Sequence, residues 1–252
     1  MRRIGFSTGA LARGDFRTAL TLLRKHDIKV VELSALRLEE LAPLVAAIPS
    51  LQLTDFSFVS IHAPSQFAPD REQWVVEQLS QLTQWGYPVI VHPDVIQEPA
   101  RWDVLGSSLV IENMDKRKRL GRTVHELSYV FERLPSARFC FDIGHARQVD
   151  PSMTEGSLLL KAFRNRLVEV HMSEVNTASR HDPISLNAVR AFGALAAAIP
   201  EEVPIILESL IDQGQSDVES ELQRARDVFA LKAKLTRVSG PFPAHDAVPT
   251  GQ

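Results

Sequence analysis

The chain has 252 residues, of which 44% are hydrophobic and 23% are charged, and its formal net charge is −3. This composition is typical of a folded globular protein, and the charge argues against a protein whose main task is to hold nucleic acid, without excluding a local basic patch. No apolar run approaches the roughly 20 residues that span a bilayer, and no apolar signal segment follows Met1. We therefore expect a cytoplasmic protein with no membrane partner. The single Cys140 excludes an internal disulfide and a cysteine-based zinc site.

Short apolar runs, many of them rich in β-branched residues, recur along the whole chain and are typical of buried strands. They lie at Ile4–Ser7, Val30–Leu33, Phe58–His62, Val89–His92, Leu109–Glu112, Phe139–Asp142, Leu167–His171 and Ile205–Glu208. The segments between them carry apolar residues at helical spacing. They predict helices after Asp15, from Leu38 to Pro49, from Asp70 to a stop at Gly86, after a Thr123–Glu126 capping box, after Thr154, from Ser185 to Ile199, and from about Ser216 to Leu235. The interval Asp94–Leu105 is short and contains Pro99, so its helix is expected to be degenerate.

Eightfold alternation of strand and helix is typical of an α/β fold of the (β/α)₈ TIM-barrel type, with a doubly wound open sheet as the main alternative. With a period of two, each strand directs a polar side chain inward near its carboxyl end: Ser7, Glu32, His62, His92, Glu112, Asp142, His171 and Glu208. In a barrel these ends meet at one mouth, where the catalytic groups of this fold lie. The pattern therefore favours a single barrel over residues 1–238 and a mobile tail at 239–252, in which His245 is a solvated bystander.

The run Phe139–His145 is central to the predicted mouth. An aspartate that ends a buried strand is costly unless something pairs with it, and a metal ion would pair with Asp142. Gly144 predicts a tight turn before His145. The other ionisable residues expected at the mouth are Glu32, His62, His92, Glu112, His171, His181 and Glu208. Carboxylates and imidazoles without a thiolate suit Mn²⁺ or Zn²⁺, with Fe²⁺, Co²⁺ and Mg²⁺ as alternatives.

Taken alone, each of these residues could have a purely structural role, as a hydrogen-bonded histidine or as a carboxylate paired with Lys or Arg. Taken together, Glu112, Asp142, His171 and Glu208 favour a metal site, because four such strand ends are not expected by coincidence.

An ordered set of motifs resembles the xylose-isomerase-like TIM-barrel superfamily, from the first strand to the last helix. The motifs are SIHAP at 60–64, VIVHP at 89–93, VIEN at 110–113, FDIGH at 141–145, VHMSE at 170–174 and ILES at 206–209. This superfamily holds sugar and sugar-phosphate isomerases and epimerases, and also endonuclease IV. The resemblance implies a barrel enzyme that uses divalent metal.

The ketose 3-epimerase branch implies our first hypothesis, an isomerase or epimerase for a small sugar or sugar phosphate. Its four metal ligands fall on Glu112, Asp142, His171 and Glu208. Glu112 and Glu208 would also move the proton next to the substrate carbonyl, by way of a metal-bound enediolate. The counterparts of His145 and Arg180 would help to hold the substrate.

Endonuclease IV implies a second hypothesis, a phosphodiesterase with three metal ions. Here His62, His92 and Glu112 would hold the first ion, Glu112, Asp142, His171 and Glu208 the second, and His145 with an Asp-x-His pair the third. Ser179 replaces that aspartate two positions before His181, and Asp182 is the only substitute nearby. The loops that insert into DNA are short here. Arg37 and Phe67 fit that part, but fit a helix start and a rim aromatic equally well.

A basic run at 113–122 lies on the same predicted rim. Its cations precede a helix N-terminus, where they oppose the helix dipole. One interpretation is that Lys116, Arg117 and the helix N–H groups bind a substrate phosphate. The other is that the run is a solvated face. We further expect Glu32 to contact substrate and the inward Glu169 to pair with a basic or hydroxyl neighbour. The third hypothesis is a metal-binding barrel without turnover. The oligomeric state stays open, with a homodimer among the alternatives.

Overall fold

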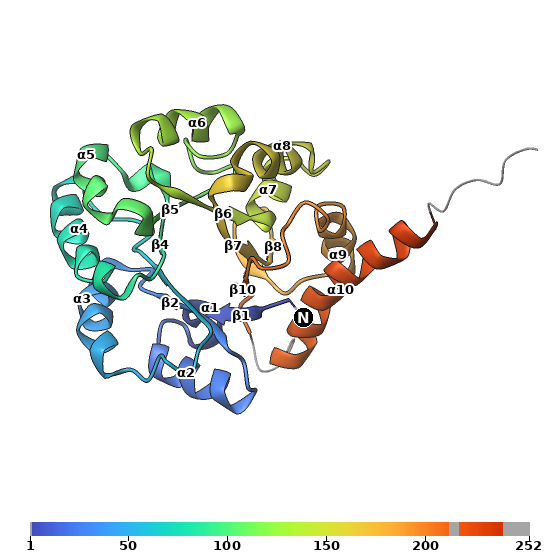
Figure 1. Ribbon diagram of the computed structural model, residues 1–252, viewed down its shortest axis with the longest axis horizontal. Coiled ribbons are helices and arrows are strands. Elements are labelled where there is room, and N and C mark those ends of the chain that lie inside the picture. Colours follow the sequence, from blue (N-terminus) through green and yellow to red (C-terminus); the bar gives the residue numbers. More distant parts are fainter. Residues whose placement is uncertain (1, 212–216, 239–252) are drawn as a thin grey trace, which may run out of the picture.

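The computed structural model describes residues 2–211 and 217–238, with side chains as far as residue 230. Parallel strands form a closed barrel in the order β1-β10-β7-β6-β5-β4-β3-β2, ringed by helices (Figure 1). The barrel strands are β1 (Ile4–Ser7), β2 (Val30–Ser34), β3 (Phe58–His62), β4 (Val89–Val91), β5 (Leu109–Glu112), β6 (Arg138–Asp142), β7 (Leu167–Met172) and β10 (Ile205–Leu207). Because β1 pairs with both β2 and β10, the sheet has no edge. The predicted TIM barrel is confirmed, and the open sheet is excluded.

The helices predicted between the strands are present. They are α2 (Phe16–Lys25), α3 (Leu38–Ala47), α4 (Glu72–Ser80), α5 (Pro99–Trp102), α6 (Val124–Arg133), α8 (Thr154–Phe163), α9 (Leu186–Gly193) and α10 (Val218–Val238). The four residues of α5 confirm that the fourth helix is degenerate. The helix predicted to reach Ile199 ends at Gly193, and turns follow it. The predicted tail at 239–252, with His245, lies outside the described residues.

Three further elements follow the carboxyl ends of β1, β6 and β7 and help to shape the mouth. They are α1 (Thr8–Ala12), α7 (Ile143–Val149) and a hairpin of β8 (Glu174–Val175) with β9 (His181–Asp182). The turn predicted at Gly144 is wrong, because α7 starts directly after Asp142, whose Oδ1 accepts a hydrogen bond from the His145 backbone N–H at 2.6 Å. Gly144 is needed for close packing instead, since a Cβ there would lie 2.4 Å from the Ser173 carbonyl oxygen.

The core has two parts, as the alternation along the strands predicts. Outward residues such as Val31 and Leu33 pack against the helices in one large apolar cluster. Inside the barrel, Ile90, Val110 and Cys140 form a small separate cluster. Above it the interior becomes polar, with fully buried carboxylates and hydroxyls. Since buried charge needs compensation, this layer is where the fold must hold either protons or cations.

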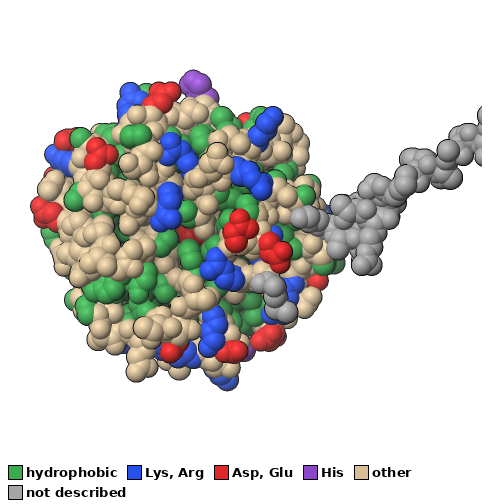
Figure 2. All heavy atoms as spheres, viewed as in Figure 1, with side chains coloured by type: hydrophobic (Ala, Val, Ile, Leu, Met, Phe, Trp, Pro, Cys, Tyr) green, Lys and Arg blue, Asp and Glu red, His purple; other side chains and the backbone are tan. Residues whose placement is uncertain are grey.

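The surface carries charges of both signs. On the face seen in Figure 2, Lys and Arg side chains alternate with acidic and uncharged ones. Among the described residues, no helix is both long and apolar enough to cross a bilayer.

Candidate metal centre

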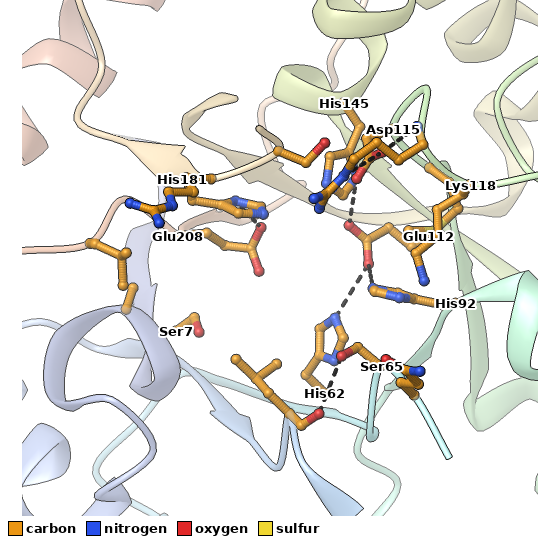
Figure 3. Close-up of a pocket in the computed structure, with 18 residues that line it drawn as sticks. Ser7, His62, Ser65, His92, Glu112, Asp115, Lys118, His145, His181 and Glu208 are labelled. Atoms are coloured by element: carbon orange, nitrogen blue, oxygen red, sulfur yellow. Dashed lines mark hydrogen bonds and ion pairs between the residues drawn. The ribbon is translucent and has the colours of Figure 1, made fainter. Parts of the chain in front are cut away.

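Glu112 reaches into the mouth from the side of His92 and Lys118, and its two carboxylate oxygens face different histidines (Figure 3). Oε2 lies 3.3 Å from Nε2 of His62 and 3.3 Å from Nε2 of His92. Oε1 lies 3.4 Å from Nδ1 of His145 and 3.4 Å from Nδ1 of His171. The Glu112 side chain is only 1% exposed. One buried carboxylate therefore joins two groups of potential ligands.

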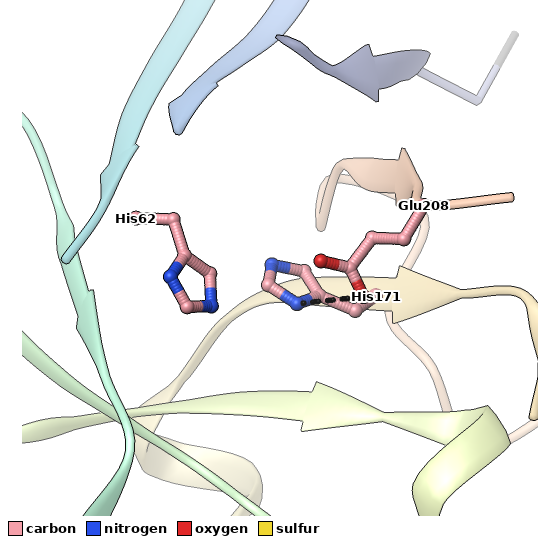
Figure 4. Close-up of side chains that lie close together, drawn as sticks. All are labelled: His62, His171 and Glu208. Atoms are coloured by element: carbon pink, nitrogen blue, oxygen red, sulfur yellow. Dashed lines mark ion pairs between the residues drawn. The ribbon is translucent and has the colours of Figure 1, made fainter. Parts of the chain in front are cut away.

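These two groups are compact enough to hold ions. Ligand atoms of His62, His92 and Glu112 lie within 4.8 Å of one another, and so do those of Glu112, Asp142, His171 and Glu208. Figure 4 shows Glu208 against His171, whose Nδ1 lies 3.5 Å from Glu208 Oε2. The predicted ligand set from β5, β6, β7 and the end of β10 thus converges.

Unpartnered atoms in these groups indicate that a cation fits. Asp142 Oδ2, Glu208 Oε2 and His171 Nδ1 are buried and have no hydrogen-bond partner. His62 donates its Nδ1–H to the Ala63 carbonyl oxygen at 2.7 Å, which leaves the lone pair of Nε2 for a metal. Buried polar groups are normally satisfied, so oxygen and nitrogen atoms left open toward one point are the pattern of a metal site.

The pKa shifts of the cluster in the absence of an ion also indicate that its buried carboxylates need positive charge. Although burial opposes it, the charges of Glu32 and Glu112 raise the pKa of His62 to about 9. Burial likewise opposes protonation of His145, but Asp142 and Glu112 raise its pKa to about 10. Burial raises the pKa of Glu208 to about 8. Protons thus neutralise the cluster in place of an ion, and metal binding must displace them.

Behind His171 lies a second buried layer. His171 Nε2 is 3.0 Å from Glu32 Oε2 and 3.6 Å from Glu169 Oε1. Glu32 is fully buried and does not line the cavity, which differs from the substrate contact expected from the sequence. The reason is that β2 continues to Ser34, which pairs with His62, whereas Glu32 pairs with Ser60 one layer below. Glu169 lies beside an imidazole, as expected, and burial raises its pKa.

Replacing Glu32 with glutamine is expected to weaken metal binding by about 10- to 100-fold, because a carboxylate on the far nitrogen of a ligand histidine orients the ring and raises its basicity. Competition with a chelating dye measures the affinity. Glu72→Gln is the matched control, since Glu72 is equally buried but bonds to Trp102 Nε1 at 2.9 Å, away from the mouth. Equal affinities in wild type and Glu32→Gln would remove this role.

His145 and His181 lie together at the mouth, but they do not complete a third metal site. Their ring centroids are 5.4 Å apart, and within the described part of the chain neither belongs to a set of three ligands. Ser179, in the place of the missing aspartate, accepts a hydrogen bond from Gln148 Nε2. Asp182 accepts one from Asn176 Nδ2 at 2.8 Å. The structure therefore brings together two of the three ligand sets that endonuclease IV implies.

The basic run contributes to the cavity only in part. Arg117 and Lys118 of this run line the cavity, whereas Lys116 does not; Arg180, between β8 and β9, lines it as well. Lys118 Nζ lies 2.7 Å from Asp94 Oδ2. The N-terminus of α6 is already occupied, because the Val124 N–H donates to Glu155 at 2.7 Å and the Glu126 N–H to Thr123 Oγ1. Two of the helix N–H groups considered for a phosphate are therefore already bonded within the protein, while side-chain cations do face the cavity.

The two residues considered as DNA wedges have other partners. Arg37 is the N-cap of α3, where it bonds to Glu40, so it marks a helix start. Phe67 packs against the main hydrophobic core.

Sequence reasoning missed the role of Asn113. Its Oδ1 accepts from the Asp142 N–H and its Nδ2 donates to the Asp142 carbonyl oxygen, each at 2.8 Å. Its own carbonyl oxygen accepts from His145 Nδ1 at 2.9 Å. Asn113 thus fixes the end of β6 and the orientation of His145. The available signal was its place directly after Glu112.

No protein-family model and no curated protein sequence matches the chain. Among solved structures, endonuclease IV from Thermus thermophilus is similar, with 18% identity and a TM-score of 0.57 over 92% of this chain and 99% of that one. A protein described as a sugar phosphate isomerase/epimerase from Anabaena variabilis has 14% identity and a TM-score of 0.53, over 95% and 100% of the two chains. A xylose isomerase-like TIM barrel/4-hydroxyphenylpyruvate dioxygenase fusion protein has 12% identity and a TM-score of 0.59, over 97% of this chain and 45% of that one. The chain thus has the fold that its motifs indicate.

Proposed function

From a barrel with the xylose-isomerase-like fold and a metal-ligand cluster at its mouth, we propose an enzyme that holds two divalent ions and hydrolyses a phosphate ester of a small molecule. The observation that carries this proposal is the bridging position of Glu112. Its Oε2 faces the His62 and His92 set, and its Oε1 faces the set of Asp142, His171 and Glu208. The mixed imidazole and carboxylate donors suit Zn²⁺ or Mn²⁺.

When bound, two neighbouring ions activate water and stabilise the attacking and leaving oxygens of a phosphoryl group. The chain itself supplies binding and proton transfer. The guanidinium group of Arg117, which lines the cavity beside Lys118, binds phosphate oxygens. Water adds to phosphorus as the bond to the leaving oxygen breaks, and the proton that the water loses passes to that oxygen. Because the Asn113 carbonyl oxygen accepts from Nδ1 of His145, which lines the cavity, we assign Nε2 of His145 to carry that proton.

The dimensions and charge of the site favour a small substrate over DNA. The cavity has a volume of about 530 Å³, which is in the range of small-molecule sites. The net charge of −3 gives no general attraction for a polyanion.

Isomerisation or epimerisation of a sugar or sugar phosphate is a second candidate, and the exposure of Glu208 favours it. Its side chain is 12% exposed and lines the cavity, whereas those of Glu112 and Asp142 are 1% and 0% exposed. Glu208 is therefore the carboxylate that can reach a substrate carbon and take its proton, with Arg180 orienting the substrate oxygens. The histidines around Glu112 support a role for it as a ligand rather than as a second base.

Loss of the first ligand set distinguishes these candidates. We expect metal-loaded wild type to hydrolyse p-nitrophenyl phosphate or its diester, and His92→Ala to reduce this rate at least about 100-fold, because one ion of the pair is lost. His125→Ala, an exposed change on α6, is the matched control.

The opposite pattern would overturn the hydrolase proposal. In that pattern, wild type hydrolyses neither ester but exchanges deuterium from solvent into a sugar phosphate, and the Glu208→Gln substitution abolishes this exchange. Metal binding without turnover in either assay would leave only the non-enzymatic hypothesis.

A further inference from the structure

One wall of the cavity carries basic side chains. Arg117 and Lys118 reach it from the loop after β5, where Asp115 also lines the cavity and Lys118 Nζ lies 2.7 Å from Asp94 Oδ2. Arg117 keeps most of its guanidinium available, because its side chain is 58% exposed and its nearest carboxylate oxygen, on Asp115, is 3.7 Å away. This wall can receive an anion beside the bridging Glu112.

Another wall is apolar. It consists of Ala10 on α1, Leu36 after β2 and Leu210 after β10. Ala10 is buried, whereas Leu36 is 38% exposed and Leu210 is 47% exposed, and apolar side chains that are exposed together in a cavity are typical of a ligand-binding surface. Their backbones are fixed, since the Leu36 carbonyl oxygen accepts from the Ser65 N–H and the Leu210 N–H donates to the His181 carbonyl oxygen. The exposed leucines are thus held in place as part of the site.

The two walls face each other. β10, β1 and β2 are consecutive in the barrel, and β5 lies four positions from β1 in either direction. In Figure 3, Lys118 and Ser7, which ends β1, accordingly stand on opposite sides of the opening, with Glu112 and Glu208 between them. A ligand that spans the mouth therefore meets cations at one end, ligand carboxylates in the middle and leucines at the other end.

We infer that the substrate is an amphipathic phosphate ester, whose phosphate lies against Arg117 and Lys118 and whose esterified group is an apolar or aromatic body that covers Leu36 and Leu210. A polyhydroxylated sugar would leave this apolar wall uncompensated, because its hydroxyls would lose water without gaining partners there. The identity of the substrate as a phosphate ester rests on the proposed function. What this inference adds is that the mouth binds an anionic group on one side and an apolar group on the other.

Binding of two probes that the enzyme cannot hydrolyse, phenylphosphonate and inorganic phosphate, to the metal-loaded protein tests this inference by calorimetry. We expect phenylphosphonate to bind about tenfold more tightly, which corresponds to covering roughly 60 Å² of apolar surface. The double variant Leu36→Ser/Leu210→Ser should reduce this ratio to nearly one. Arg117→Ala should weaken both probes by a similar factor and keep the ratio.

Leu186→Ser is the matched control, because Leu186 is 71% exposed but lies on α9, outside the cavity. Equal affinity of wild type for the two probes, or a ratio that survives the double leucine variant, would overturn the inference. The outcome is separable from that of the proposed function, since binding is measured without turnover. Even if the protein hydrolyses no ester, the ratio of its affinities for the two probes still tests whether the apolar wall binds ligand.

Discussion

Replacing Glu112 with alanine is expected to empty both metal sites at once. The two oxygens of this carboxylate serve different ligand sets, so its loss leaves His62 and His92 without an anionic partner and removes one of four ligands from the other set. We expect metal content to fall from two ions per chain to none, and turnover to fall more than about a thousandfold, because water activation and charge stabilisation are lost together. Elemental analysis of the purified variant, with an assay of turnover, measures both.

Two variants make this test specific. His92→Ala should lose one ion and keep the other, because His92 belongs only to the first set. Glu126→Gln should keep both, since Glu126 pairs with Arg122 at 2.6 Å on α6. A Glu112→Ala protein that still holds two ions would show that the carboxylate does not bridge.

Removal of metal is the second change with a large expected effect, and it acts on stability. A ligand present at 1,000 times its dissociation constant stabilises the fold by about 4 kcal/mol. For a chain of this size we therefore expect chelation to lower Tm by about 8–16 °C, which differential scanning calorimetry measures. The physical reason is that Glu112 and Asp142 are buried close to each other and to the carboxylate of Glu208, so the group needs compensating positive charge.

The Glu112→Ala variant provides the control for this shift. Its Tm should not respond to chelator, because it has no bound ion to lose. An unchanged Tm in chelated wild type would mean that protons on the histidines compensate the carboxylates as well as an ion does, and would contradict a structural contribution of the metal.

The barrel could be predicted because each strand gives two signals. An apolar run marks burial, and a polar residue at its end marks the mouth, so the period of two places Glu112, Asp142 and His171 on one side before any coordinates are known. That convergence holds in the structure. The alternation of side chains along a strand does not, however, give the level at which each inward side chain lies in the barrel. Glu32 has the correct parity, but β2 runs two residues further, so that Ser34 occupies the level of His62 and Glu32 lies behind His171.

Other differences arise where tertiary contacts override a local signal. Gly144 suggested a turn, yet it lies inside α7 because only glycine fits against the Ser173 carbonyl oxygen. The hairpin that carries His181 has strands of two residues, too short to leave a periodic pattern. Within the basic run, adjacent cations go to different places: Arg117 and Lys118 line the cavity, and Lys116 does not. Because a loop has no regular periodicity, the sequence does not indicate which of these side chains point into the cavity.

The proposed function depends on two ions, one on each side of the Glu112 carboxylate. Anomalous diffraction from crystals of the metal-loaded protein, recorded at the absorption edge of the bound metal, would locate them. We expect two peaks per chain, one among His62, His92 and Glu112 and the other among Glu112, Asp142, His171 and Glu208. A single peak, or peaks away from Glu112, would show that Glu112 does not join two metal sites.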